Sequence, residues 1–326
     1  MPDHPVAAPA QPDSHEPDVV GTGARRILTG RVVRWGFVAV AVAFGAYAVV
    51  GQWSAVRAAL VDIGPLAIVG AFVAVLVAML ASMQVWRVLL AALGSPLPVL
   101  AAAKVVFVGQ LGKYLPGSIW PVLAQMELGT AHKVPRRRSA TASVLTMLVS
   151  LLGGLLAALG TLPFLAGAMP YRWAFLAAPV LLAALHPRVL NPVLAALLRL
   201  ARRPPLEQPL TGRAVLVALG WSLASWLLYG VQVWLFAVRL GAPDGRAVLL
   251  AIGGFAFAWS VGFLVVFAPA GAGVREVLLV AVFGPLVGVG GATAIAVVSR
   301  ILMTVGDLAA AGVVAAWSGR RRPSTG

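Results

Sequence analysis

The chain has 326 residues, of which 60% are hydrophobic and 11% are charged, and its mean hydropathy is +0.94. A soluble domain carries about 25% charged residues, so this composition excludes a soluble globular protein and indicates a polytopic membrane protein. Cysteine is absent, which excludes a disulfide framework, a thiol nucleophile and a cysteine-ligated metal or haem. In a soluble protein, the formal net charge of +15 would suggest nucleic-acid binding. Here the basic residues gather beside apolar segments, which argues against that interpretation.

The basic residues that flank the apolar segments predict the orientation of the chain. Their clusters are Arg25, Arg26, Arg31 and Arg34; Lys133, Arg136, Arg137 and Arg138; Arg199, Arg202, Arg203 and Arg213; and Arg320, Arg321 and Arg322. By the positive-inside rule, we expect a multi-pass protein of the cell membrane with both termini in the cytoplasm. Near the surface, each cation attracts anionic inner-leaflet phospholipid by about 1 kcal/mol, so the expected partners are membrane lipids, not nucleic acid.

Residues 1–24 combine prolines with acidic residues and lack apolar periodicity, which predicts a disordered cytosolic tail. Residues 25–318 are expected to form a single transmembrane domain, followed by a basic cytosolic tail at 319–326. The first apolar run, 32–51, is predicted to act as a signal anchor because no small-residue cleavage site follows it.

Apolar runs of about 20 residues, the length that a helix needs to cross the hydrocarbon core, predict the spans. They lie at 32–51, 64–86, 139–160, 172–186, 214–238, 247–268, 277–290 and 292–317, and the fourth and seventh are short. The expected fold is an all-α polytopic integral membrane protein with about eight transmembrane helices and one or two re-entrant or broken segments. Residues 189–200 are interpreted either as an interfacial helix or as the end of the fourth span.

Two segments break the apolar pattern. Cytosolic charge flanks residues 97–127, so this segment either re-enters the membrane, which we prefer, or lies along the interface; it contains the sequence VGQLGKYLPGSIWP at 108–121. The second break, APAGAGVRE, lies at 268–276. Within a bilayer, backbone broken by Gly and Pro is tolerated only where protein or a water-filled cavity satisfies its polar groups. Both breaks are therefore candidate sites, and the residues predicted to interrupt the helices are Gly112, Pro116, Gly117, Pro269, Gly271 and Gly273.

The sequence lacks the common signatures of enzymes. The stretch GQLGK at 109–113 lacks the spacing and the Ser or Thr of a phosphate loop. None of the four histidines belongs to a metal-binding pair, and neither a nucleophile elbow nor paired catalytic carboxylates occur. We expect no enzyme, no catalytic residues, no cofactor and no metal site.

Ionisable groups near the bilayer centre cost at least about 2.5 kcal/mol on insertion scales, so their presence indicates a function. Lys113 and Tyr114 are predicted to hold a lipid phosphate. In the alternative interpretation, Lys113 snorkels to the inner headgroups and Tyr114 lies in the aromatic belt. Arg275 and Glu276 follow a Gly-rich turn at a helix start, where backbone N–H groups and a guanidinium suit phosphate. The alternative for Arg275 is a structural ion pair with Glu276 or Glu127.

The last span carries two further charges, Arg300 and Asp307. They are seven residues apart, so they lie on nearly the same helix face about two turns from one another. This face should look into the bundle, either as a packing pair between helices or along a substrate path. Glu127 is expected to neutralise the neighbouring basic loop.

The two breaks also carry a resemblance to a known family. Residues 112–120 match a Gly-Lys-Tyr-hydrophobic-Pro-Gly-x-hydrophobic-Trp segment, and residues 269–276 match a Pro-x-Gly-x-Gly-Val-Arg-Glu segment. In the second, Ala270 and Ala272 stand where glycine or leucine is often found. On these motifs, residues 30–318 resemble the membrane family typified by the flippase region of lysylphosphatidylglycerol synthase.

The resemblance implies a polytopic helical protein that moves an amphiphilic lipid between leaflets. Such a lipid would be a phospholipid, an aminoacylated or glycosylated lipid or a polyprenyl carrier. The chain ends soon after its last span, so the cytosolic synthase domain of some members is not expected, and a separate lipid-modifying enzyme is an expected partner.

Our hypothesis is that the two breaks face each other and form a polar cleft for the headgroup. Lys113 and Arg275 would neutralise phosphate, while Tyr114 and Glu276 would set its orientation; Arg300 and Asp307 are further candidates. Two other interpretations stay open. A secondary transporter of small solutes would use similar broken helices, whereas a membrane scaffold predicts that the breaks lie apart and that the charges pair locally.

Overall fold

A computed structural model describes residues 57–58, 61–114, 119–161, 176–200, 209–264 and 273–319. Throughout these ranges every regular element is a helix, which confirms the all-α fold expected from the sequence. The predicted N-terminal tail, the first apolar run at 32–51, the last seven residues, and Pro116, Gly117, Pro269 and Gly271 lie outside the described residues.

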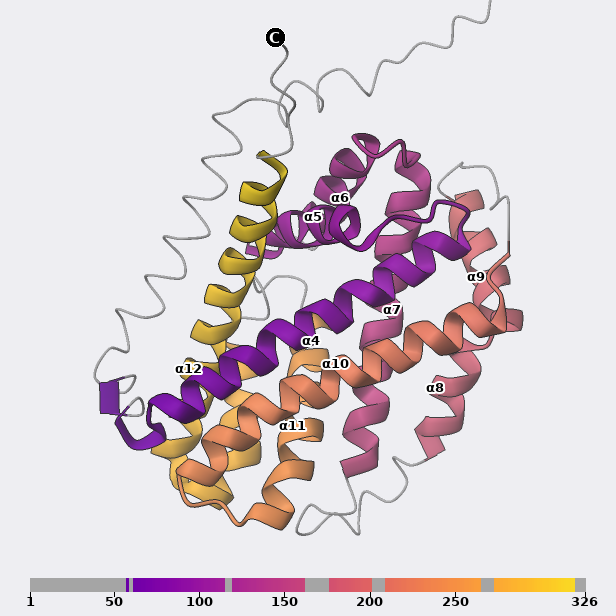
Figure 1. The fold of residues 1–326 in the computed structure, drawn as a ribbon. Coiled ribbons are helices and arrows are strands. Elements are labelled where there is room, and N and C mark those ends of the chain that lie inside the picture. The colour runs from indigo at the N-terminus through magenta and orange to yellow at the C-terminus, as the bar shows by residue number, and fades with distance from the viewer. Residues whose placement is uncertain are drawn as a thin grey trace, which may run out of the picture. The chain divides into compact units, whose positions relative to one another are not determined.

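The helices follow the apolar runs closely (Figure 1). In chain order they are α4 (Pro65–Ala92), α5 (Val99–Gln110), the 3-10 turn η1 (Leu111–Tyr114), α6 (Trp120–Thr130), α7 (Arg136–Thr161), α8 (Ala177–Leu185), α9 (Pro187–Leu200), α10 (Gly212–Arg239), α11 (Asp244–Leu264) and α12 (Val274–Gly319). Local chemistry sets their ends. Pro65 begins α4, where a missing N–H costs nothing, and the side chain of Thr211 caps α10 by accepting from the Ala214 N–H.

Among the described residues, five helices are long and apolar enough to cross a membrane, or six if the pair α8 and α9 counts as one bent span. The five are α4, α7, α10, α11 and α12. The expected count of about eight is not confirmed, because the first run lies outside the described residues and α8 and α9 are each short. A bend of 65° separates α8 from α9, so residues 187–200 form a helix of their own and do not continue α8.

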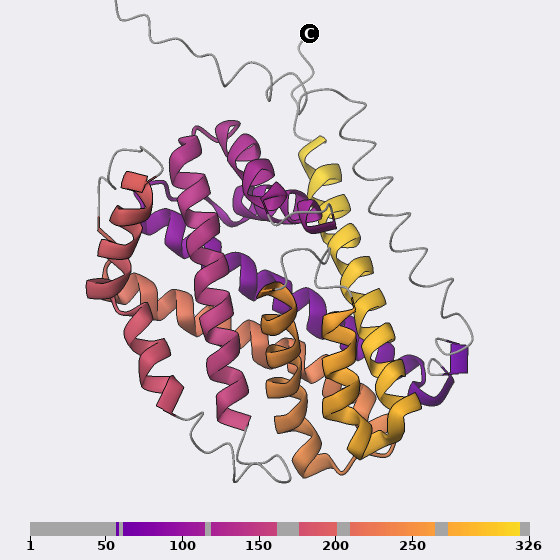
Figure 2. The same cartoon turned by 180° about the vertical axis from the view of Figure 1, so that it is seen from behind.

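The last helix, α12, folds back on itself at Gly288, whose φ of 74° and ψ of 161° are not helical. Arg300 and Glu276 lie 24 residues apart, which would be about 36 Å in a straight helix. Their side chains nevertheless form an ion pair of 2.5 Å, so the two arms, 274–287 and 289–319, run side by side (Figure 2). The first arm spans about 21 Å, less than the hydrocarbon core of about 30 Å.

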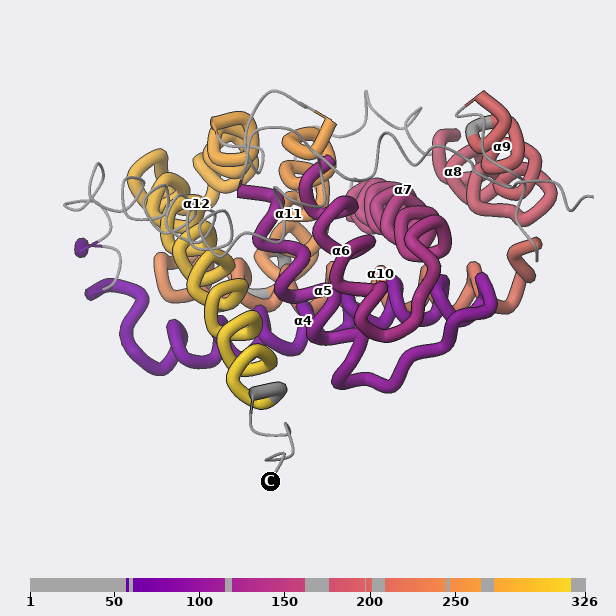
Figure 3. The backbone as a smooth tube through the Cα atoms, turned by 90° about the horizontal axis from the view of Figure 1, so that it is seen from above, coloured from indigo at the N-terminus to yellow at the C-terminus, as the bar shows by residue number. Residues whose placement is uncertain are grey.

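The segment from α5 to α6 is a helical hairpin with η1 at its tip, packed between α12 and α7 (Figure 3). Two glycines allow the close approach. A Cβ on Gly109 would lie 3.3 Å from the backbone N of Gln125, and one on Gly112 would lie 2.6 Å from the backbone N of Pro121. With 12 residues, α5 is about 18 Å long and cannot cross a bilayer alone. Re-entry of this hairpin into the membrane stays a prediction.

The hairpin is tied to the bundle by a buried polar network. Trp86 on α4 donates its indole N–H to Ser143 on α7 at 3.2 Å, and Ser143 donates to Gln125 on α6 at 2.5 Å. Ser139 also donates to the backbone carbonyl of Gln125, at 2.9 Å. Three helices therefore meet at Gln125, in the middle of α6, where it also packs against Gly109 of α5.

Candidate functional site

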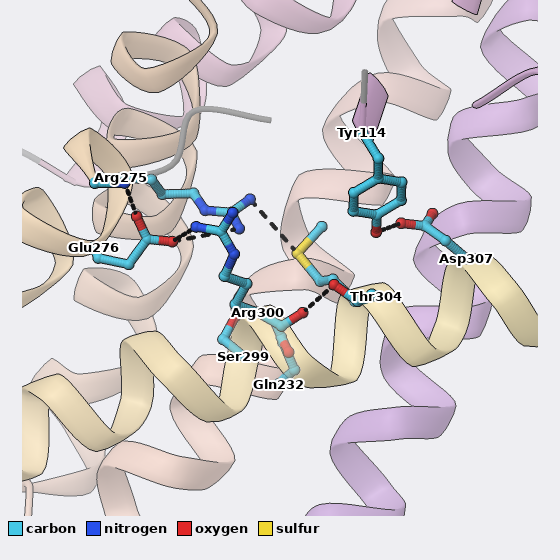
Figure 4. Close-up of polar contacts among 10 residues, drawn as sticks. Tyr114, Gln232, Arg275, Glu276, Ser299, Arg300, Thr304 and Asp307 are labelled. Atoms are coloured by element: carbon cyan, nitrogen blue, oxygen red, sulfur yellow. Dashed lines mark hydrogen bonds and ion pairs between the residues drawn. The ribbon is translucent and has the colours of Figure 1, made fainter. Parts of the chain in front are cut away.

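The six predicted site residues form two clusters along the second arm of α12. Figure 4 shows five of them, Tyr114, Arg275, Glu276, Arg300 and Asp307. We call them the arginine cluster, made of Arg275, Glu276 and Arg300, and the Asp307 cluster, made of Lys113, Tyr114 and Asp307. Each joins a broken segment to α12. The described ends of the two broken segments therefore lie where charges are paired.

The arginine cluster is held by Glu276. Its Oε1 atom accepts from Arg300 Nη1 at 2.5 Å and lies 4.0 Å from Arg275 Nη2. Its Oε2 atom accepts from the backbone N–H of Gly273 at 2.7 Å, which fixes the carboxylate at the start of α12. Gly273 has a φ of 87°, which glycine adopts without backbone strain, and this lets the chain turn into α12 at that residue.

Arg275 is buried but weakly hydrogen-bonded. The residue is 8% exposed, and its contacts within the described part of the chain are Glu276 Oε1 and Met303 Sδ, each at 4.0 Å. A guanidinium has five N–H donors, and a thioether is a poor acceptor. Arg275 thus keeps donors available inside the bundle, which is the arrangement that an anionic ligand satisfies.

The Asp307 cluster places two donors on one oxygen. Asp307 Oδ2 accepts from the Tyr114 hydroxyl at 2.6 Å and lies 2.6 Å from Lys113 Nζ. Both donors come from η1, the tip of the α5–α6 hairpin, and the Lys113 ammonium lies 5.5 Å from the centre of the Tyr114 ring. The Asp307 side chain is 6% exposed and that of Lys113 is 30% exposed, so the pair is partly open on the lysine side.

The two clusters occupy one face of α12. Seven residues separate Arg300 from Asp307, which is about 10 Å along the helix axis. Arg275 Nη1 lies 4.0 Å from Sδ of Met303, which stands between Arg300 and Asp307 in the sequence of α12, so Arg275 reaches toward this face. Three cations and two carboxylates leave the combined site with one net positive charge.

The geometry shows which of these charges pair with one another. Arg300 and Asp307 do not pair with each other; each pairs with a residue from a broken segment. Glu127 lies 3.0 Å from Arg136, which confirms that it neutralises the basic loop and leaves Arg275 to Glu276. Lys113 pairs with Asp307.

Two residues of α10 border the site and were not predicted. Gln232 is fully buried and donates to Ser299 at 2.8 Å, directly beside Arg300. Tyr229 interacts electrostatically with Asp307 and Arg275. A lone amide inside an apolar run was the available signal for Gln232, whereas a tyrosine in a span carries no such signal. Among the described residues no group of His, Asp and Glu could hold a metal ion.

Comparison with known proteins supports the resemblance seen in the motifs. A family model described as the lysylphosphatidylglycerol synthase TM region matches residues 35–311. The match includes both broken segments and α12 as far as residue 311. A search of the curated proteins finds no match.

Proposed function

We propose, because the chain belongs to the family of the lysylphosphatidylglycerol synthase transmembrane region, that it is a lipid translocase. Family membership supports a role for this membrane protein in handling lipids. The proposal goes further: the chain moves the phosphate-bearing headgroup of an amphiphilic lipid between leaflets. Its site is the face of α12 that carries the arginine cluster and the Asp307 cluster.

The observation that carries the proposal is the state of Arg275. A buried guanidinium with unused donors, in a site with one net positive charge, suits a ligand with one negative charge and several acceptor oxygens. The phosphodiester of a phospholipid has both properties. The phosphate oxygens would accept hydrogen bonds from Arg275 and Arg300. Glu276 contacts the same two arginines in the described structure.

The Asp307 cluster would guide the headgroup along the same face. Lys113 is partly exposed and adds a third cation beside Asp307, about two helical turns from Arg300, so a phosphate leaving the arginines meets another positive charge. Tyr114 offers a hydroxyl at the same level. The acyl chains would stay in lipid, because long apolar side chains outside this face are exposed on α4, including Leu66, Val69 and Val73.

A passive scaffold fits the contacts less well. It predicts that intramembrane charges pair with sequence neighbours, yet Tyr114 and Asp307 are 193 residues apart and join the tip of one broken segment to the last helix. A solute transporter remains distinct in one measurable respect, since it predicts uptake of a water-soluble substrate driven by an ion gradient.

The test is headgroup flip of labelled phospholipid in proteoliposomes containing purified protein. A charge-assisted hydrogen bond contributes about 1.5–3 kcal/mol, so Arg275→Ala is expected to slow flip by at least about tenfold. Lys113→Ala is expected to slow it as well. Arg213→Gln, which removes an exposed cation at the start of α10, is the control and should leave the rate unchanged.

Unchanged flip in both Arg275→Ala and Lys113→Ala would remove the proposed roles of these residues. Absence of flip in the wild-type protein, together with uptake of a small solute, would favour the transporter.

A further inference from the structure

We infer that two broken helical hairpins enter the membrane from opposite sides and that each closes the charged site from its own side, so that the site opens to the two faces in turn. One is the α5–α6 hairpin. The other, which we call the α11–α12 hairpin, consists of α11 and the first arm of α12. Use of this access by a lipid headgroup rests on the proposed function, whereas the placement of the hairpins does not.

The helices that precede the two hairpins form an antiparallel pair. Both α4 and α10 have 28 residues, and they lie side by side (Figure 1). Arg239 at the end of α10 donates from Nε to the backbone carbonyl of Ile63, just before α4 begins, at 2.9 Å. Further along α4, a Cβ on Gly70 would lie 3.4 Å from the side chain of Leu235. The contacts advance along α4 as they retreat along α10, so the two helices run in opposite directions.

Each hairpin follows one of these helices, so the two hairpins begin at opposite ends of the pair. Residues 93–98 join the end of α4 to α5, and residues 240–243 join the end of α10 to α11. A helix of 28 residues is about 42 Å long, which exceeds the hydrocarbon core of about 30 Å. The two ends of the pair therefore belong to opposite sides of a bilayer.

The order of the elements repeats as well. A long helix, a broken hairpin and another long helix occur as α4, α5–α6 and α7, and again as α10, α11–α12 and the second arm of α12. The units differ in detail, since α5 has 12 residues and α11 has 21. Inverted units of this kind let a site between them face the two sides of a membrane alternately.

The described ends of both hairpins meet on the second arm of α12. At the tip of the α5–α6 hairpin, Lys113 lies 2.6 Å from Asp307. At the tip of the α11–α12 hairpin, Glu276 pairs with Arg300. The seven residues between Arg300 and Asp307 correspond to about 10 Å along the helix axis, so the two tips approach one short stretch of α12.

The position of this stretch along α12 places it inside the membrane. Arg300 is 12 residues from Gly288, where the helix turns back, and this is about 18 Å. Asp307 is likewise 12 residues, or about 18 Å, from the last helical residue, Gly319. Each tip therefore reaches its partner well away from either end of the second arm, and each hairpin covers the site from one side.

Both hairpins are closed on the site in the described structure. Arg275 is 8% exposed and Asp307 is 4% exposed. The polar contacts that hold the two tips are separate, because Asp307 binds one tip and Arg300 binds the other. One tip can therefore leave α12 while the other stays, which gives access from one side and keeps the other side sealed.

The absence of cysteine allows a test with single thiols. Met303→Cys places a thiol between Arg300 and Asp307, at a position that contacts Arg275. Its reaction with a membrane-impermeant methanethiosulfonate that bears a sulfonate is measured on the full chain in right-side-out and inside-out vesicles. Two exposed positions mark the sides: Ala131→Cys in the turn after α6, and Val61→Cys before α4.

We expect Met303→Cys to react from both sides. Ala131→Cys should react only from the side on which the α5–α6 hairpin enters, and Val61→Cys only from the other. Vesicles in which both markers react from the same side, or in which Met303→Cys reacts from one side only or from neither, would overturn the inference.

Variants that weaken one tip should act on one side. Asp307→Asn is expected to speed the reaction of Met303→Cys from the Ala131 side by at least about tenfold, the change that loss of one charge-assisted hydrogen bond produces. Glu276→Gln should do the same from the Val61 side. Tyr114→Phe and Arg300→Gln weaken the same two tips and serve where the first variants do not fold.

Glu127→Gln is the matched control, because it neutralises a carboxylate on α6 whose partner is Arg136; it should leave both rates unchanged. Equal acceleration from the two sides by the variants of either tip would also overturn the inference.

The labelling result does not depend on transport. If the thiol is reached from both sides but wild-type proteoliposomes do not flip lipid, the proposed function fails and the two-sided access stands. If lipid is flipped while the thiol is reached from one side only, the translocase stands and the inference is overturned.

Discussion

Gly112→Ala tests whether the close approach of η1 to α6 maintains the site. An added Cβ would lie 2.6 Å from the backbone N of Pro121 and 2.7 Å from the backbone carbonyl carbon of Trp120. Both are backbone atoms, so the clash cannot be relieved by rotating a side chain. Either α6 or η1 must move, and η1 carries Lys113 and Tyr114 toward Asp307.

Overpacking of this kind costs about 1–3 kcal/mol, and we expect the upper end because backbone must shift. For a domain of 150–250 residues, 1 kcal/mol corresponds to about 2–4 °C in the unfolding midpoint, so Gly112→Ala should lower it by several degrees. Gly220→Ala is the matched control. No atom lies within 4 Å of the Cβ that it adds inside α10, so it should be neutral or stabilising by up to about 1 kcal/mol.

The assay is thermal unfolding of both variants in the same detergent, with lipid flip measured in parallel. Gly112→Ala is expected to lose flip as well as stability, because displacement of η1 separates Lys113 and Tyr114 from Asp307. An unfolding midpoint and a flip rate for Gly112→Ala equal to those of Gly220→Ala would refute the reasoning.

Two further predictions concern charge. Glu276→Gln leaves Arg275 and Arg300 without their carboxylate and should destabilise by about 3 kcal/mol, the low end for a buried pair because Glu276 is 21% exposed. Glu127→Gln at the surface should cost under about 1 kcal/mol, and equal unfolding midpoints for the two variants would contradict this. His132 lies in the turn after α6, and its pKa is lowered, first by burial and second by the charge of Lys104. The folded state therefore binds a proton at His132 less readily than the unfolded state does. The stability that the neutral imidazole contributes is present above the ordinary imidazole range and is lost as the pH falls. Lys104→Gln should raise that pKa only in part, and an NMR titration showing no change would count against the role of Lys104.

Much of the fold follows from local patterns that the sequence displays. Helix length and apolar periodicity depend on neighbouring residues, so the runs at 64–86, 139–160 and 214–238 correspond to α4, α7 and α10. The breaks were visible for the same reason, since a lysine, a tyrosine and glycines interrupt an apolar stretch. The family was also recognisable from these two motifs, and the match over residues 35–311 confirms it.

Some local features were harder to interpret from the sequence. A single run at 172–186 and the following residues became two helices, α8 and α9, separated by a bend of 65°. His186 and Pro187 lie at that bend, and the residue before a proline is driven out of helical conformation. The proline was present in the sequence, but its consequence depends on whether packing supports a continuous helix.

The spacing of Arg300 and Asp307 along the chain already predicts that they share a face of the last helix, because helical periodicity depends only on that spacing. The tertiary structure decided which charges they meet. Gly288 turns α12 back so that Glu276 reaches Arg300, and the α5–α6 hairpin brings Lys113 and Tyr114 to Asp307. Pairing of charges depends on which elements pack together, so partners 193 residues apart leave no local trace in the sequence.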